Sequence, residues 1–153
     1  VTQRSASAEG FVRVSHALAA AIEANTVKKG SVLEVARLAG ILAAKRTDEL
    51  IPLCHTLPLD AVDVSATLDP ARADDAFRRV RVVASVRTLS RTGVEMEALT
   101  AVAVACLTVI DMGKAIDKAM VIEGVRVLEK HGGRSGSYVA TGATPESSAG
   151  GQR

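Results

Sequence analysis

The chain has 153 residues, of which 48% are hydrophobic and 24% charged, and its formal net charge is +2. This is the composition of one soluble globular domain, and the balanced charge excludes the basic surface of a protein that binds DNA. Aromatic residues make up 2% of the chain, too few for the stacking platforms with which proteins bind single-stranded nucleic acid.

The two cysteines, Cys54 and Cys106, lie in apolar surroundings, which is typical of a reducing compartment and not of a disulfide framework. No apolar run is long and charge-free enough for a signal peptide or a membrane span, so we expect a cytoplasmic protein without a membrane segment. We expect one domain over residues 1–140. The small, polar, Gly-rich residues 141–153 predict a disordered tail.

A strand and a short helix are predicted first. Residues 2–14 partly alternate between apolar and polar side chains, which is typical of a strand. Ser15 is a suitable N-cap for a short helix over the Ala-rich residues 16–25.

A second helix is predicted after the turn VKKG. Ser31 and Glu34 have the spacing of a capping box, which places the start of this helix at residue 32. We expect it to continue to about Leu50, because Pro52 disfavours helical geometry in the residue before it.

Two strands and a long helix follow. Residues 62–68 and 80–87 alternate cleanly and predict a hairpin with a long loop. Thr92 and Glu95 form a second capping-box pattern, and the helix that it opens is expected to reach about Ala119. The middle of this helix is apolar or small on all sides, which predicts burial all round.

A last strand is expected over about 122–129. The resulting order, β-α-α-β-β-α-β, is a ferredoxin-like βαββαβ unit with an extra N-terminal helix, in the α+β class. Its helices would cover one face of an antiparallel sheet. The other face would need cover, so we expect an oligomer.

Charged residues lie at both ends of the long helix. At about 100° per residue, Glu97, Asp111, Lys114 and Lys118 fall within about 60° of one another, and Glu95 points nearly opposite. Asp111 and Lys114, at i,i+3 spacing, can touch. They are either an ordinary ion pair on a solvated face or a pair that transfers protons.

The segment LIPLCHTLPL contains Cys54 and His55. The cysteine can be a small core residue, and the histidine can simply satisfy a backbone group. A Cys–His nucleophile pair is disfavoured, because adjacent residues of an extended segment point to opposite sides, and zinc-ligand spacing is absent. A histidine beside an anionic ligand explains the segment better. Basic residues that could accompany it at element ends and in Gly-rich turns are Lys28, Lys29, Lys45, Arg46, Arg87, Arg91 and Arg134.

Four segments together resemble the MoaC family, the cyclic pyranopterin monophosphate synthases of molybdenum cofactor biosynthesis. They are TQRSASA, KKGSVLEVARLAGILAAKRTDELIPLCHTLPL, LSRTGVEMEALTAVAVACLTVIDMGKAIDK and MVIEGVRVLEKHGGRSG. The resemblance implies a ferredoxin-like subunit in a homohexamer, a trimer of dimers, with active sites at subunit interfaces. It implies a lyase that converts 3′,8-cyclo-7,8-dihydro-GTP to cyclic pyranopterin monophosphate and releases pyrophosphate. No redox cofactor or protein-bound metal is implied, although Mg²⁺ can accompany the triphosphate.

The resemblance also implies the site residues. The family's catalytic aspartate and lysine match Asp111 and Lys114, which implies acid–base catalysis. Its substrate-binding positions, together with two charged neighbours that we assign to the same site, match Leu53, Cys54, His55, Met96, Glu97, Lys29, Arg4, Glu95 and Lys118.

The sequence departs from the family at two positions near these residues. Thr56 stands where the family usually has proline, and Gly113 stands where a larger residue is common. Two other functions stay open: a non-catalytic oligomer that binds a nucleotide or a partner enzyme, and a cysteine/histidine metal-binding domain.

Overall fold

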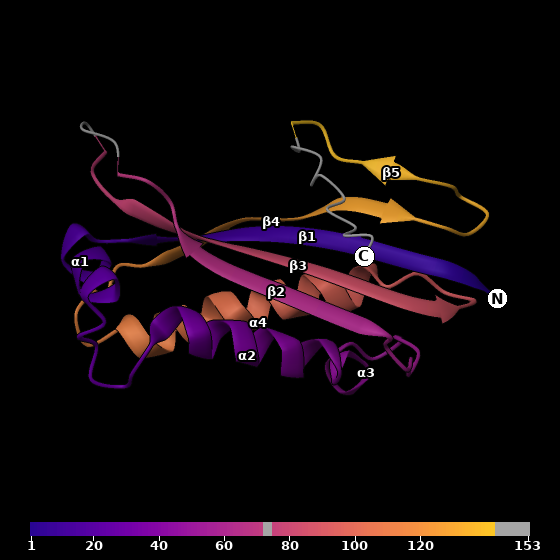
Figure 1. Cartoon of the computed structure of the whole chain (residues 1–153), viewed down its shortest axis with the longest axis horizontal. Helices are drawn as coiled ribbons and strands as arrows, with labels where there is room; N and C mark the ends of the chain where they lie inside the picture. Colours follow the sequence, from indigo (N-terminus) through magenta and orange to yellow (C-terminus); the bar gives the residue numbers. More distant parts are fainter. Residues whose placement is uncertain (72–74, 143–153) are drawn as a thin grey trace, which may run out of the picture.

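The computed structural model describes residues 1–71 and 75–142, so the predicted tail lies outside the described residues from 143 onward. A five-stranded antiparallel sheet in the order β2-β3-β1-β4-β5 packs one face against a layer of helices (Figure 1). The elements in chain order are β1 Thr2–Val14, α1 His16–Ala24, α2 Val32–Ala44, α3 Thr47–Leu50, β2 Ala61–Leu68, β3 Arg78–Ser90, α4 Glu95–Gly113, β4 Val121–His131 and β5 Tyr138–Val139.

The predicted α+β fold is confirmed. Without α1, α3 and β5 the order is βαββαβ, with β1 and β3 in the centre and β4 and β2 outside them, which is the ferredoxin-like arrangement. The alternation in the predicted hairpin has the expected cause, since Val80, Val82 and Val86 of β3 are fully buried beneath the helices.

Helix α4 lies against the centre of the sheet, and α2 runs beside it in the opposite direction (Figure 1). Small residues permit the close approach: a Cβ on Gly10 of β1 would lie 2.6 Å from Val102 Cγ1 of α4. Among the described residues, α4 is the one helix long and apolar enough to span a membrane, and it is largely buried inside the fold. A core helix of a soluble protein has the same properties.

The predicted helix over 32–50 breaks in two. Helix α2 ends at Ala44, and the Thr47 hydroxyl donates to the carbonyls of Ala43 and Ala44 at 3.2 and 3.0 Å. A buried threonine that bonds to these last carbonyls favours a new turn, α3, over continuation.

The long helix also ends earlier than predicted, at Gly113 instead of about Ala119. The carboxylate of Asp117 accepts hydrogen bonds from the backbone N–H of Ser15 at 2.7 Å and of Ala119 at 2.9 Å. This buried tie to the start of α1 turns the chain away from the helical path.

The predicted caps had mixed outcomes. Ser15 caps α1 as expected, accepting from the N–H of Leu18 at 3.1 Å. Neither capping box forms, because the Ser31 side chain makes no cap bond and the N-cap of α4 is Val94. Glu95 instead pairs with Lys130 of β4 at 3.3 Å.

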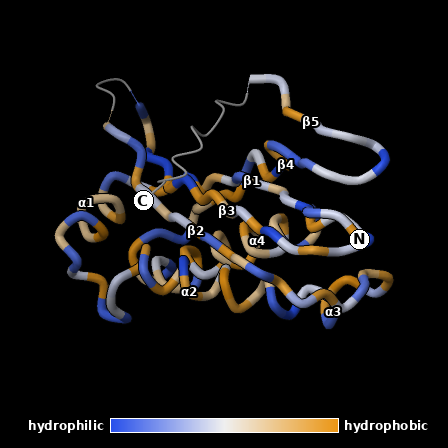
Figure 2. Tube along the Cα trace, turned by 45° about the vertical axis from the view of Figure 1, so that its right-hand side comes forward, coloured by the Kyte–Doolittle hydropathy of each residue, from blue (hydrophilic) through white to orange (hydrophobic). Residues whose placement is uncertain are grey.

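The sheet face opposite the helices carries a buried carboxylate among its other side chains. Buried Glu9 of β1 accepts from Arg81 of β3 at 3.2 Å and from Arg126 of β4 at 2.8 Å. Arg126 also donates to the carbonyl of Thr141, which fixes the chain after β5. Strand β5 was not predicted, because a strand of two residues is too short to show alternation of apolar and polar side chains. The turn HGGRSG before β5 is white to blue in Figure 2, which marks residues of intermediate to hydrophilic character.

Candidate active site

An acid–base cluster lies where α4 ends. Lys114 Nζ donates to Asp111 Oδ1 at 2.8 Å, and Lys29 Nζ, from the turn before α2, reaches Asp111 Oδ2 at 3.3 Å. The hydrogen bond from Lys114, and next the one from Lys29, lower the pKa of Asp111 below its ordinary value. All three side chains are more than half exposed, so this cluster is open to a ligand.

A second cluster forms near the start of α4. Glu97 is only 3% exposed, and its Oε1 lies 3.5 Å from the Cys54 thiol. Its other oxygen, Oε2, is buried and has no partner among the described residues. Burial raises the pKa of Glu97, and burial together with the charge of Glu97 raises the pKa of Cys54. Both shifts favour the uncharged forms of the carboxyl and the thiol.

The neighbours of Cys54 are exposed. Leu53 is 93% exposed, Met96 is 39% exposed, and His55 points into solvent.

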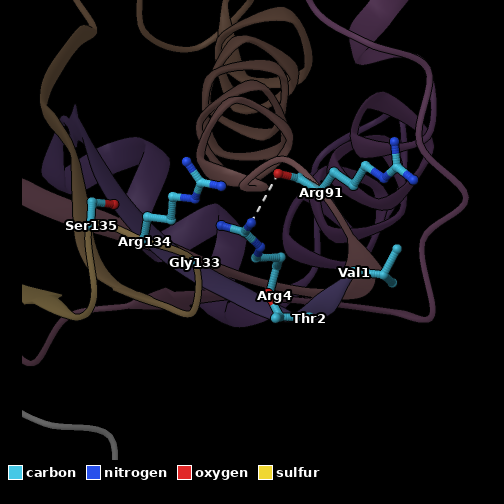
Figure 3. Close-up of a pocket in the computed structure, with 7 residues that line it drawn as sticks. All are labelled: Val1, Thr2, Arg4, Arg91, Gly133, Arg134 and Ser135. Atoms are coloured by element: carbon cyan, nitrogen blue, oxygen red, sulfur yellow. Dashed lines mark hydrogen bonds between the residues drawn. The ribbon is translucent and has the colours of Figure 1, made fainter.

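A pocket of about 780 Å³ opens beside the start of β1 (Figure 3). Its charged lining consists of Arg4, Arg91 and Arg134. Arg4 is held by the carbonyls of Ser90 and Arg91, at 3.3 and 2.9 Å, so its charge is positioned but not neutralised. A concave site with three guanidinium groups suits phosphate.

The turn HGGRSG shapes this pocket. Gly133 has φ +81°, and a Cβ there would overlap the guanidinium of Arg4. Gly132 has φ +98°, and a Cβ there would overlap the carbonyl of Gln3. Both glycines are therefore needed for the turn and for the position of Arg4.

The predicted site residues divide between the two ends of α4. The lysine and aspartate cluster lies at its C-terminal end; Glu95, Glu97, Arg4 and the segment from Leu53 to His55 lie toward its N-terminal end. Glu97 and Asp111 are separated by about 21 Å along the helix axis. Lys118, predicted on the same helix, lies beyond its end and is exposed.

Sequence reasoning did not single out Asp48, Lys130 or Gly133. The HGGRSG turn was a visible signal, whereas Asp48 gains its place only through the tertiary fold. Within residues 1–71 and 75–142, no three His, Cys, Asp or Glu side chains lie close enough together to hold a metal ion.

The fold and these clusters define a ferredoxin-like α+β protein with an arginine-lined pocket and an exposed aspartate that pairs with two lysines. The chain belongs to the MoaC family, whose model matches residues 1–133. A protein of Methylobacterium sp. (strain 4-46) is 55% identical over 139 residues, which cover 91% of this chain and 84% of that protein. One of Cereibacter sphaeroides (strain ATCC 17029 / ATH 2.4.9) is 52% identical over 141 residues, 92% of this chain and 86% of that protein. Both are named cyclic pyranopterin monophosphate synthase.

Proposed function

We propose that this chain is a lyase of molybdenum cofactor biosynthesis that converts 3′,8-cyclo-7,8-dihydro-GTP to cyclic pyranopterin monophosphate and releases pyrophosphate. Membership of the MoaC family and the names of its relatives support this reaction. The observation that carries it is the cluster at the end of α4, in which one exposed aspartate is shared by two lysines.

In the proposed mechanism Lys114 moves protons while the cage of ribose and purine opens and closes again as a pyranopterin. Asp111 orients Lys114 through the bond of 2.8 Å and stays ionised, because its pKa is lowered. Lys29 holds the other carboxylate oxygen and adds positive charge next to the reacting groups.

The substrate is held at the other end of α4. Arg4, with Arg91 and Arg134, binds the triphosphate and stabilises the pyrophosphate as it leaves. Leu53, His55 and Met96 form an exposed wall for the ring system. The reaction needs no redox cofactor, and Mg²⁺ on the triphosphate would be carried by the substrate.

We infer a homohexamer, a trimer of dimers, with each site shared between two subunits. The separation of about 21 Å between the two ends of α4 supports the shared site, because one nucleotide bound to one chain does not bridge it while making short contacts at both. The number of subunits is what the resemblance to the MoaC family implies. The enzyme would act in the cytoplasm, without nucleic acid or a membrane.

A coupled assay tests the reaction. The enzymatically made substrate is added to the purified protein, and pyrophosphate and the oxidised fluorescent pterin are followed together. Wild type should release both, and Lys114→Ala should release neither while keeping its fold. A folded protein that binds the substrate and forms no product would instead favour a non-catalytic binding role.

Mixing of two inactive variants tests the shared site. Lys114→Ala and Arg4→Ala are unfolded together and refolded at equal amounts. If the two residues of one site come from different chains, about a quarter of the sites regain both. If mixing restores no activity although mixed oligomers form, each site is built from one chain.

A further inference from the structure

The segment that presents Leu53, Cys54 and His55 is the loop 51–60, between α3 and β2. Backbone hydrogen bonds fix both ends of the loop. The N–H of Ile51 donates to the carbonyl of Thr47 at 2.9 Å, and the N–H of Asp60 donates to the carbonyl of Arg87 at 2.9 Å. Inside the loop, Leu57 and Leu59 pack against the core. The stretch between Pro52 and Leu57 is exposed or half-buried and needs other contacts to hold its shape.

Two bonds between side chains connect this stretch to other elements of the described structure. The Cys54 thiol reaches Glu97 Oε1 at 3.5 Å, a long and weak bond. The Thr56 hydroxyl donates to Asp48 Oδ2 at 2.7 Å, a short bond to a carboxylate. The stronger of the two therefore ties the loop to α3, one residue after His55.

Asp48 also acts on the cysteine by its charge. Burial is the main cause of the raised pKa of Cys54, and the charge of Glu97 is the next. The charge of Asp48 raises the pKa of Cys54 further. Asp48 likewise adds to the raised pKa of Glu97, after burial and the charge of Glu95. The charge of Asp48 thus acts on the thiol and on Glu97, while its hydrogen bond in this loop is with Thr56.

We propose that Asp48 is a positioning residue: by accepting the hydrogen bond of Thr56 it holds Leu53, Cys54 and His55 in the place where they meet the substrate. This inference rests on the proposed function for the substrate and on the bond of 2.7 Å for the geometry. Loss of the bond lets the loop spread over several conformations, so substrate binding suffers more than the chemical step, which takes place at Lys114.

The variant that removes the bond is Thr56→Val, which keeps the side-chain shape, and its matched control is Thr56→Ser, which keeps the hydroxyl. We expect Thr56→Val to raise KM by about 2- to 10-fold with kcat within about twofold of wild type, and Thr56→Ser to behave as wild type. Asp48→Ala removes the same bond from the other side and should repeat the change in KM.

A readout independent of turnover is alkylation of Cys54 by iodoacetamide, assigned to its peptide by mass spectrometry. Cys106 is fully buried and serves as the unreactive internal reference. Thr56→Val should speed alkylation about 2- to 10-fold, because the thiol leaves Glu97 more often. Asp48→Asn keeps an oxygen for Thr56 but not the charge, so the pH midpoint of alkylation should fall, and KM should rise less than in Asp48→Ala.

The kinetic measurements and the alkylation measurements together distinguish failure of the proposed function from failure of the proposed role of Asp48. If wild type makes no product, the proposed function fails, and the alkylation rates still decide the role of Asp48. If Thr56→Val and Asp48→Ala match Thr56→Ser in alkylation rate and in KM, the positioning role is wrong. A loss of kcat without a change in KM or in alkylation would also overturn it.

Discussion

Lys29 and Asp111 join the two main helices at one end of the helical layer. Lys29 Nζ lies 3.3 Å from both Oδ2 and the backbone oxygen of Asp111, although 82 positions separate the two residues in the chain. Asp111 is therefore held on one side by its own helical segment, through Lys114, and on the other by the turn that precedes α2.

Lys29→Ala should lower kcat/KM about 10-fold or more, because a positioned charge next to the reacting groups is lost. Lys28→Ala is the matched control: Lys28 is the neighbouring exposed lysine and makes no ion pair among the described residues. Steady-state kinetics of both variants check this. Equal activities would remove Lys29 from the site. The free energy of unfolding should change by less than about 1 kcal/mol in either variant, as for exposed ion pairs.

Asp111→Asn tests the lowered pKa of Asp111. A carboxyl whose folded pKa lies below its ordinary value of 3.8 adds stability above that value and loses it as the pH falls through the folded pKa. Urea unfolding should therefore show a constant difference between wild type and Asp111→Asn from pH 5 to 8, which shrinks below about pH 4. A difference that changes across neutral pH would contradict the assignment.

Glu97→Gln tests the opposite sign. The pKa of buried Glu97 is raised above 4.5, so the folded protein binds more protons than the unfolded chain and loses stability as the pH rises through this range. Glu97→Gln should remove that loss, so its stability relative to wild type should increase as the pH rises above 4.5. Glu49→Gln, at an exposed position, is the control. Its free energy of unfolding should differ from that of wild type by a constant amount over the same pH range.

Gly133→Ala should weaken substrate binding, because its Cβ displaces the guanidinium of Arg4 from the pocket. Gly136→Ala carries a similar backbone cost at φ +70° but meets no atom within 4 Å. We expect both variants to lose stability to a similar degree, about 1–2 kcal/mol. Only Gly133→Ala should also raise KM. The same KM for both would mean that Arg4 does not contact the substrate.

The sequence predicted the fold because alternation in the strands and apolar composition in α4 are local properties. The two helix ends were wrong for tertiary reasons: Thr47 bonds back to α2, and Asp117 reaches the start of α1 from a distant position in the chain. The capping-box patterns also failed: Glu34 pairs with Arg37 of its own helix, and Glu95 pairs with Lys130 of β4.

The candidate site was predicted as a set of residues but not as a geometry. Helical periodicity predicts that Glu97 and Asp111 lie on related faces, but it does not report their distance along the axis or that Glu97 is buried and Asp111 exposed. The carboxylate that holds Thr56 had no sequence signal, since Asp48 looks like any acidic residue in a helical turn.

The length of α4 has a consequence for how the chain tolerates insertions and deletions. The helix carries the buried acid near its start and the lysine cluster at its end, on one rigid element. One added or deleted residue between Glu97 and Asp111 would turn the second group by about 100° and shift it by about 1.5 Å relative to the first. Homologues are therefore expected to vary in length in the β2–β3 connection and after β5, and to keep the number of residues between these two carboxylates fixed.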